Sequence, residues 1–290
     1  MKKFSVKSLY DDATATVTYV VFDEATRDAV VIDPVLDYDP ASSKISTESV
    51  DQLEALIREH KLVPHYCLET HAHADHLSGA QELKKRFPGI VLAIGERITR
   101  VQNVFKKVYN LPEHFIPNGS QFDLLLKEKQ RINAGSIDIE VLFTPGHTPA
   151  CASYLIGDAV FTGDAIFMPD TGTGRCDFPE GSSAALYSSI SEKLFKLPDA
   201  TRVFVGHDYK GSGTREARWE TSIGEQKRSN IQLKAETAKE DYIKMRDARD
   251  ATLSAPRLLL PSLQVNIDGG RLPEPEPNGT SYLKIPLRKH

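Results

Sequence analysis

A short stretch of the chain contains three histidines and an aspartate within six positions. They are His71, His73, Asp75 and His76, in the spacing H-x-H-x-D-H, and they follow a β-type run at residues 66–69. Side chains repeat every two residues in an extended segment, so His71 and His73 are expected on the same side. Imidazole and carboxylate groups together suit borderline metals such as zinc, iron and manganese. The spacing therefore predicts a metal site rather than a polar turn that is merely rich in histidine.

Three further candidate ligands come later in the chain, each at the end of a β-rich run. They are His147, Asp164 and His207.

Composition narrows the classes of function. The 290 residues are 40% hydrophobic and 26% charged, which is ordinary for a globular chain with one large core or two modest ones. A net charge of −4 gives no basic footprint for nucleic acid. No segment approaches the roughly 20 apolar residues that span a membrane, and the N-terminal residues lack a signal-peptide pattern. We therefore expect neither nucleic acid nor membrane as a partner.

Cysteine usage is sparse and odd in number. The three residues, Cys67, Cys151 and Cys176, indicate a reduced, cytoplasmic protein rather than a disulfide scaffold. Cys67 and Cys151 are interpreted as buried packing residues. For Cys176, which lies nearer the predicted chemistry, packing and a reactive thiol both stay open.

Hydrophobic periodicity predicts alternating strands and helices. Strands are expected at residues 4–9, 16–22, 29–32, 66–69, 90–94, 137–143, 152–156, 159–161 and 202–205. Helices are expected around residues 50–57, at 77–87, 96–109 and 182–197, and as two or more segments within 215–253. Residues 33–46 read as a polar loop, and the proline-rich segment from Pro256 reads as extended surface chain.

The metal-ligand motifs resemble those of the metallo-β-lactamase superfamily. The resemblance rests on H-x-H-x-D-H after a strand and on the short motifs around His147, Asp164 and His207, and it spans about residues 10–230. It implies an α/β (α+β) fold, a four-layer αββα sandwich. We expect a catalytic domain at residues 1–240, with a helical and extended tail at 241–290 packed on the same domain.

The family resemblance leaves open whether the chain binds one metal or two. In dinuclear members, one metal binds the residues that match His71, His73 and His147. The second binds those that match Asp75, His76 and His207, and Asp164 bridges the two.

The sequences flanking two ligands resemble those of persulfide dioxygenases. Gly174–Phe178 matches the family's G-R-x-D-F element and Gly206–Tyr209 matches its G-H-D-Y. The resemblance implies one Fe(II) per chain, held by His71, His147 and Asp164. The residues around it would be His73, Asp75, His76 and His207. The implied reaction oxidises glutathione persulfide with O2 to sulfite and glutathione.

Arg175, Tyr209 and Lys210 are the candidate substrate-binding residues. A guanidinium suits a glutathione carboxylate, but an ion pair of Arg175 with Asp177 is the alternative. A homodimer or higher homo-oligomer and a rhodanese-type sulfur donor are further expectations.

Two competing functions are kept. One is a glyoxalase-II-like thioester hydrolase with a dinuclear metal site, and the other is a metal-stabilised interaction module without catalysis.

Overall fold

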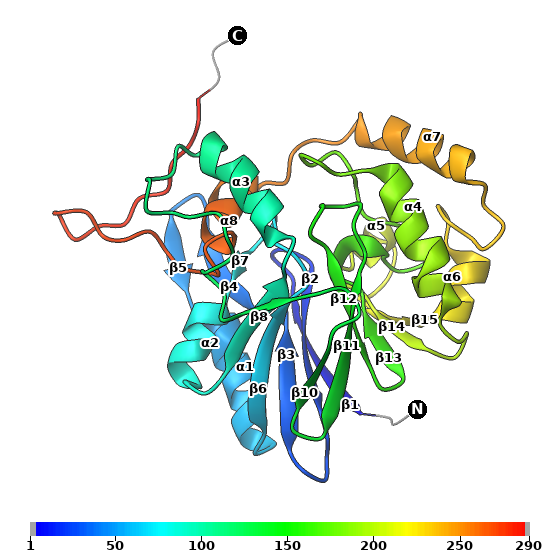
Figure 1. Cartoon of the computed structure of the whole chain (residues 1–290), viewed down its shortest axis with the longest axis horizontal. Coiled ribbons are helices and arrows are strands. Elements are labelled where there is room, and N and C mark those ends of the chain that lie inside the picture. Colours follow the sequence, from blue (N-terminus) through cyan, green and yellow to red (C-terminus); the bar gives the residue numbers. More distant parts are fainter. Residues whose placement is uncertain (1–3, 288–290) are drawn as a thin grey trace.

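Two six-stranded β-sheets carry most of the buried chain (Figure 1). The computed structural model describes residues 4–287, apart from the side chain of Ser212. Across the first sheet the order is β1 (Ser5–Asp11), β2 (Thr16–Phe22), β3 (Asp28–Ile32), β6 (Val63–Glu69), β8 (Val91–Gly95) and β9 (Leu124–Leu126). Across the second the order is β10 (Arg131–Ala134), β11 (Ile137–Phe143), β12 (Ala152–Ile156), β13 (Ala159–Phe161), β14 (Arg202–Phe204) and β15 (Glu220–Ser222).

Strand direction brings the predicted ligands to one edge. β13 and β14 pair in parallel, and β11 runs the same way because two antiparallel pairings separate it from β13. The segments that follow these three strands therefore leave the second sheet at the same edge. They carry His147, Asp164 and His207.

The two sheets pack face to face around an apolar layer. Val21, Ile32 and Leu68 of the first sheet belong to the same buried cluster as Val141 and Phe161 of the second. β2 is buried along its whole length, which explains its continuous run of β-branched and aromatic residues. The packing of this inner layer fixes the positions of the strands whose ends lead to the candidate ligands.

Helices cover the outer face of each sheet, which gives the four-layer αββα sandwich (Figure 1). The first sheet is covered by α1 (Glu48–Glu59), α2 (Ala80–Arg86), α3 (Ile98–Val108) and α8 (Leu259–Asn266). The second is covered by α4 (Ser183–Glu192), α6 (Ile223–Ser229) and α7 (Lys239–Asp250). Shorter elements are the 3₁₀ turns η1 (Gly163–Ala165) and η2 (Leu194–Lys196) and the helical turn α5 (Lys210–Gly213). The predicted fold class is confirmed.

The segment expected as a polar loop at residues 33–46 forms two strands. β4 (Val35–Asp39) pairs with β5 (Lys44–Ser46) and with β7 (Leu77–Ser78) in a small third sheet. The expected helix at 77–87 consequently begins only at Ala80. Local periodicity did not reveal these strands because they are short, and β4 is held on its other side by β7, which is distant in sequence.

The expectation of extended surface chain from Pro256 onward is wrong for its first part. Residues 259–266 form α8, whose last five residues are buried. Pro261 lies in the first turn, where a missing N–H costs no intrahelical hydrogen bond. Likewise, residues 215–253 contain the strand β15 beside the expected helices α6 and α7.

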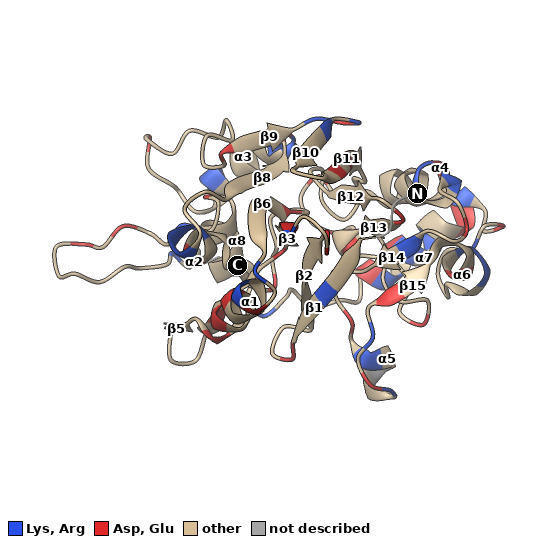
Figure 2. Cartoon of the chain, turned by 90° about the horizontal axis from the view of Figure 1, so that it is seen from below, with Lys and Arg blue, Asp and Glu red and all other residues tan. Residues whose placement is uncertain are grey.

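Charged residues of both signs are interspersed along the helices and loops in the view of Figure 2. Within residues 4–287 no helix is long and apolar enough to cross a membrane.

Candidate metal centre

The histidine-rich loop follows β6 and is almost wholly buried. His71, His73 and His76 are at most 1% exposed. β7 follows immediately and pairs with β4, so the loop is short and held at both ends. As expected, a strand ends directly before the loop that carries these candidate ligands.

His71, His147 and Asp164 form one group at the centre. Each contributes an atom lying within 4.8 Å of the others'. Oδ2 of Asp164 is 4.0 Å from Nε2 of His71 and 3.6 Å from Nε2 of His147. The three residues come from three different strand ends and meet only in the folded chain.

A second group lies on the other side of Asp164. It comprises His73, Asp75, His76 and His207. Nε2 of His207 is 3.1 Å from Oδ2 of Asp75 and 3.3 Å from Oδ1 of Asp164. Asp164 therefore faces the first group with Oδ2 and the second with Oδ1.

Outward hydrogen bonds fix the ring nitrogens of the first group. The Thr70 hydroxyl donates its proton to Asp33 (2.8 Å), so it accepts from Nδ1–H of His71 (3.0 Å). His147 donates Nδ1–H to the carbonyl of Arg175 (2.7 Å). Both rings consequently carry their free lone pair on Nε2, which points toward Asp164.

Buried polar atoms without a hydrogen-bond partner gather at this centre. Within the described part of the chain they include Nε2 of His71, His76 and His207, and Oδ1 of Asp164. Orphaned buried polar atoms cost free energy unless something satisfies them. A metal ion in the first group would satisfy Nε2 of His71, and one in the second group would satisfy Nε2 of His76 and His207. The imidazole and carboxylate donors suit iron, zinc or manganese.

The pKa shifts of His71 and His76 agree with metal binding. Burial, and then the neighbouring histidines, lower the pKa of His71 well below its usual range. Burial likewise lowers the pKa of His76. Neutral imidazole is the form that binds a metal.

His73 differs from the other motif histidines. Its Nε2 lies 3.0 Å from Oδ1 of Asp33 and 3.5 Å from Oε2 of Glu69, so the ring sits between two buried carboxylates. Although burial opposes a charge, Asp33 and Glu69 raise the pKa of His73 well above its usual value. The two acids were missed in the sequence, and the only signal for Asp33 was its place beside Pro34 at a strand end.

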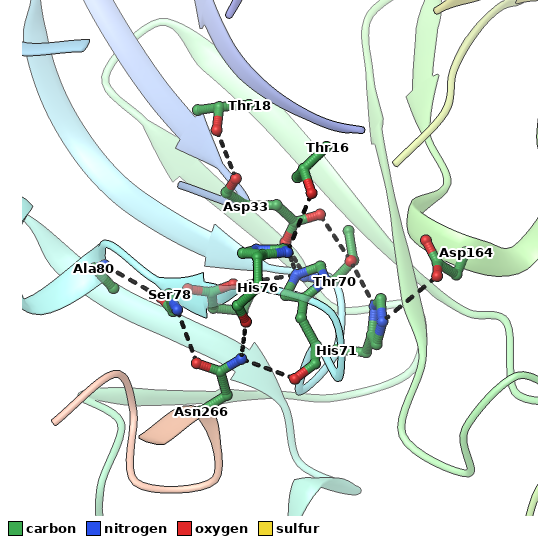
Figure 3. Close-up of polar contacts among 12 residues, drawn as sticks. Thr16, Thr18, Asp33, Thr70, His71, His76, Ser78, Ala80, Asp164 and Asn266 are labelled. Carbon is green, nitrogen blue, oxygen red and sulfur yellow. Dashed lines mark hydrogen bonds and ion pairs between the residues drawn. The ribbon is translucent and has the colours of Figure 1, made fainter. Parts of the chain in front are cut away.

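Asn266 of α8 braces the same loop from the C-terminal part of the chain. Its amide donates to the carbonyls of His73 and His76 and accepts from the N–H of Ser78, each at 2.8 Å (Figure 3). Asn266 is 4% exposed. No sequence motif marked it.

A cavity of about 500 Å³ opens onto the first group. Its lining includes His147, Asp164, Phe178, Tyr209 and Arg175. The expected substrate residues Arg175 and Tyr209 therefore reach the cavity. Tyr209 also stacks on His207, with ring centroids 5.9 Å apart.

All three nitrogens of the Arg175 guanidinium have hydrogen-bond partners within the protein. Nε and Nη2 bind the two oxygens of Asp177 at 2.6 Å, and Nη1 donates to the carbonyl of Ser254 (2.8 Å). The ion pair with Asp177 is the alternative to substrate-carboxylate binding that the sequence left open for Arg175. Lys210 is absent from the cavity lining and pairs with Asp12 (2.6 Å).

Helix α7 holds the loop that carries Arg175. Asp250 accepts the N–H of Cys176 (2.7 Å) and pairs with the buried Arg246 (2.6 Å). Arg246 also donates to the carbonyl of Thr173 (3.2 Å). Because His147 bonds to the carbonyl of Arg175, this loop fixes the orientation of a candidate ligand.

The cysteines lie in apolar surroundings. Burial raises the pKa of the Cys176 and Cys67 thiols, and it raises that of Cys151 to about 12. A thiol in this state is not a ready nucleophile. For Cys176, packing is therefore favoured over the reactive alternative.

A family model and several known proteins match this chain. The model of the metallo-beta-lactamase superfamily matches residues 11–207. Glyoxylase B2 of Dictyostelium discoideum is 49% identical over 275 residues, which are 94% of each chain. The beta-lactamase hydrolase-like protein of Xylella fastidiosa is 48% identical over 97% of this chain and 64% of its own length.

Less similar relatives include proteins named ETHE1. The mitochondrial persulfide dioxygenase ETHE1 of Homo sapiens is 32% identical over 208 residues, covering 71% of this chain and 69% of that protein. The crystal structure of ETHE1 from Myxococcus xanthus superposes with a TM-score of 0.74 and 34% identity. It covers 92% of this chain and 100% of that one.

Proposed function

Because this chain belongs to the metallo-beta-lactamase superfamily, we propose that it is a persulfide dioxygenase with one Fe(II) per chain. The substrate is glutathione persulfide. With O2 and water it gives glutathione, sulfite and two protons, a balance in which both O2 atoms and one water oxygen end on the outer sulfur.

The observation that carries the proposal is the group of His71, His147 and Asp164. Two histidines and one carboxylate on one side of a metal are typical of non-haem iron oxygenases, because they leave neighbouring positions open. The cavity adjoins this group, and Phe167 and Phe178 form apolar parts of its wall. The similarity to human persulfide dioxygenase supports the same reading.

Bound Fe(II) would supply a site at which O2 and an anionic sulfur react side by side. The protein's own residues prepare that site. His71 and His147 are pre-oriented by Thr70 and by the Arg175 carbonyl. The Tyr209 ring forms part of the cavity wall and would flank the substrate's sulfur end.

A second candidate is a glyoxalase-II-like thioester hydrolase. The group of Asp75, His76 and His207 favours it, because these residues could hold a second metal beside Asp164. The name of the Dictyostelium relative points the same way.

Two assays on the purified protein separate the candidates. We expect O2 uptake and sulfite formation on an oxygen electrode with freshly made glutathione persulfide. Hydrolysis of S-lactoylglutathione without O2 uptake would favour the hydrolase instead. His147→Ala is the matched inactive control for both reactions. A homo-oligomer, a rhodanese-type sulfur donor and cytoplasmic localisation stay predictions.

A further inference from the structure

A chain of side-chain hydrogen bonds links the β1–β2 hairpin to the second histidine group. The Thr16 hydroxyl lies 3.3 Å from Nδ1 of His76 and 3.3 Å from Nδ1 of His207. It also lies 2.7 Å from the hydroxyl of Thr14, which bonds to Oδ2 of Asp11 at 2.5 Å. Figure 3 shows the Thr16 hydroxyl directed at the ring of His76.

The number of available protons gives this series of hydrogen bonds a single donor-to-acceptor direction. The carboxylate of Asp11 already accepts the N–H groups of Ala13 and Thr14, so it accepts the Thr14 hydroxyl proton as well. With its proton used, the Thr14 oxygen must accept from Thr16. The Thr16 proton is then also used, and its two lone pairs are left to accept from two donors.

We propose that Thr16 is a positioning residue that holds Nδ1 of both His76 and His207 protonated. Nε2 of each ring then carries a free lone pair, and that of His207 lies beside Asp75 and Asp164. One hydroxyl thereby sets the metal-binding form of two candidate ligands that lie 131 positions apart in the sequence. Asp11, at the other end of this hydrogen-bond series, fixes the donor-to-acceptor direction.

The backbone holds the hairpin against the ligand segment. The N–H of Val17 donates to the carbonyl of Gly206 (2.9 Å), and that of Asp208 donates to Ala15 (3.0 Å). Thr16 and His207 form the bridge between these two bonds. Thr16 is 1% exposed, so water cannot replace its hydroxyl.

His207 is the more sensitive reporter of the two rings. For His76, Oδ1 of Asp75 lies 3.5 Å from Nδ1 and offers a second acceptor. For His207, the structure gives Nδ1 no hydrogen-bond partner other than Thr16 within residues 4–287. Carboxylates of Asp75 and Asp164 surround its Nε2 instead and would draw the proton there if Thr16 were lost.

The test uses the full chain, labelled with ¹⁵N and freed of metal, so that no ion bound at Nε2 dictates which ring nitrogen carries the proton. Nitrogen-15 NMR of the imidazoles reports which ring nitrogen carries the proton. In wild type we expect protonated Nδ1 for His71, His147, His76 and His207. In Thr16→Val, the proton of His207 should move from Nδ1 to Nε2, where Asp75 and Asp164 accept it, while His71 and His147 keep theirs on Nδ1 because other acceptors hold them. Thr16→Ser should restore the wild-type pattern.

Chelator competition for Zn²⁺ provides a second readout that does not depend on activity. Loss of an outer partner of a ligand costs about 10–100-fold in metal affinity or activity, so we expect a loss of this size for the weakest-bound Zn²⁺ in Thr16→Val only. Thr221→Val, which removes another buried threonine hydroxyl far from the centre, is the control.

Either of two results would overturn the proposal. One is a protonated Nδ1 of His207 in Thr16→Val, unchanged from wild type. The other is an equal disturbance of all four rings in both Thr16→Val and Thr16→Ser, because the hydroxyl would then not be the cause. Neither result bears on whether the enzyme consumes O2.

Discussion

The two carboxylate oxygens of Asp164 face two different groups of histidines. Oδ2 lies toward His71 and His147, and Oδ1 lies toward His207. A single iron needs only the first group, whereas a dinuclear centre uses both. The number of metals per chain is therefore a property that single substitutions can test.

Removing ligands should have unequal effects if one iron is bound. His71→Ala, His147→Ala and Asp164→Ala delete direct bonds and should empty the site. Asp75→Ala, His76→Ala and His207→Ala delete outer partners, for which losses of about 10–100-fold in affinity or activity are typical. Elemental analysis of wild type and the six variants is the measurement. About two metals in wild type, falling to one in the His76 and His207 variants, would contradict the mononuclear proposal.

Arg175 is expected to act mainly through the loop that it braces. Arg175→Lys keeps the charge but cannot bind both Asp177 and the carbonyl of Ser254. We expect a loss of about 1 kcal/mol in stability, since the pair is partly exposed, together with weaker metal retention. Thermal unfolding and metal content measure both.

Arg100→Lys is the matched control, because its exposed ion pair with Glu180 lies outside the cavity lining. A stable, metal-replete Arg175→Lys with a raised KM would instead assign the guanidinium to substrate binding.

At the scale of elements, short-range contacts between strands and turns join the two sheets. Asp28 of β3 bonds to His65 of β6 and to the N–H of Ser136 in the β10–β11 turn. Gly135 permits this approach, since it has a φ of +60° and a Cβ there would lie 2.2 Å from the Asp28 carboxylate. Asp28 is thus a polar link between the layers.

That link predicts a pH dependence of stability. Hydrogen bonds from Thr26, His65 and Ser136 lower the pKa of Asp28 to about 2, below the value of about 3.9 for an unfolded aspartate. The contribution is therefore complete above about pH 4 and is lost as the pH falls through about 2. Asp28→Asn should lower Tm at pH 7, and its difference from wild type should shrink by pH 2. A difference that grows toward low pH would contradict this assignment.

Helix α8 is expected to stabilise the metal loop through Asn266. Asn266→Ala leaves two buried carbonyls and one buried N–H without partners. Each such group costs about 1–3 kcal/mol, so we expect a loss of about 3 kcal/mol or more in unfolding free energy, together with loss of metal. Denaturant unfolding and elemental analysis are the measurements.

Gln264→Ala is the control for Asn266→Ala, because it removes another largely buried amide of α8 whose bonds go to Leu260 and Lys284. Equal metal loss in both variants would mean that α8 acts only through its packing.

At the scale of the molecule, the C-terminal part of the chain completes the centre. α7 holds the Arg175 loop and α8 holds the histidine loop, yet both lie beyond residue 207, where the family match ends. α7 and α8 thus support a centre whose candidate ligands all lie earlier in the chain.

Truncations should separate the two parts of this segment. Deleting residues 251–290 removes α8 and should yield protein with little bound metal. Deleting 271–290 removes mostly exposed chain and should leave metal content near wild type. Metal content and thermal unfolding of the two truncated chains are the measurements, and equal metal loss in both would contradict a specific role for α8.

The sequence by itself determined the candidate ligands. The residue types and close spacing of the H-x-H-x-D-H motif predicted a metal site, and its members gather in two candidate groups, although residues 70–76 form a loop with bends and not the extended segment that was expected. Long apolar runs such as residues 16–22 and 137–143 were correctly assigned as strands, because burial on a sheet imposes their composition. The resemblance of the motifs supplied the αββα architecture.

Only the tertiary structure decided the surroundings of those ligands. Asn266 lies 193 positions from His73, and Thr16 lies 191 from His207, so no local pattern could pair them. The protonated nitrogen of each ring depends on the hydrogen-bond partner that folding brings to it. A helix within a proline-rich segment likewise forms because α8 has an apolar surface to pack against. Local geometry fixes which side chains can bind a metal, and long-range packing fixes their orientation and charge.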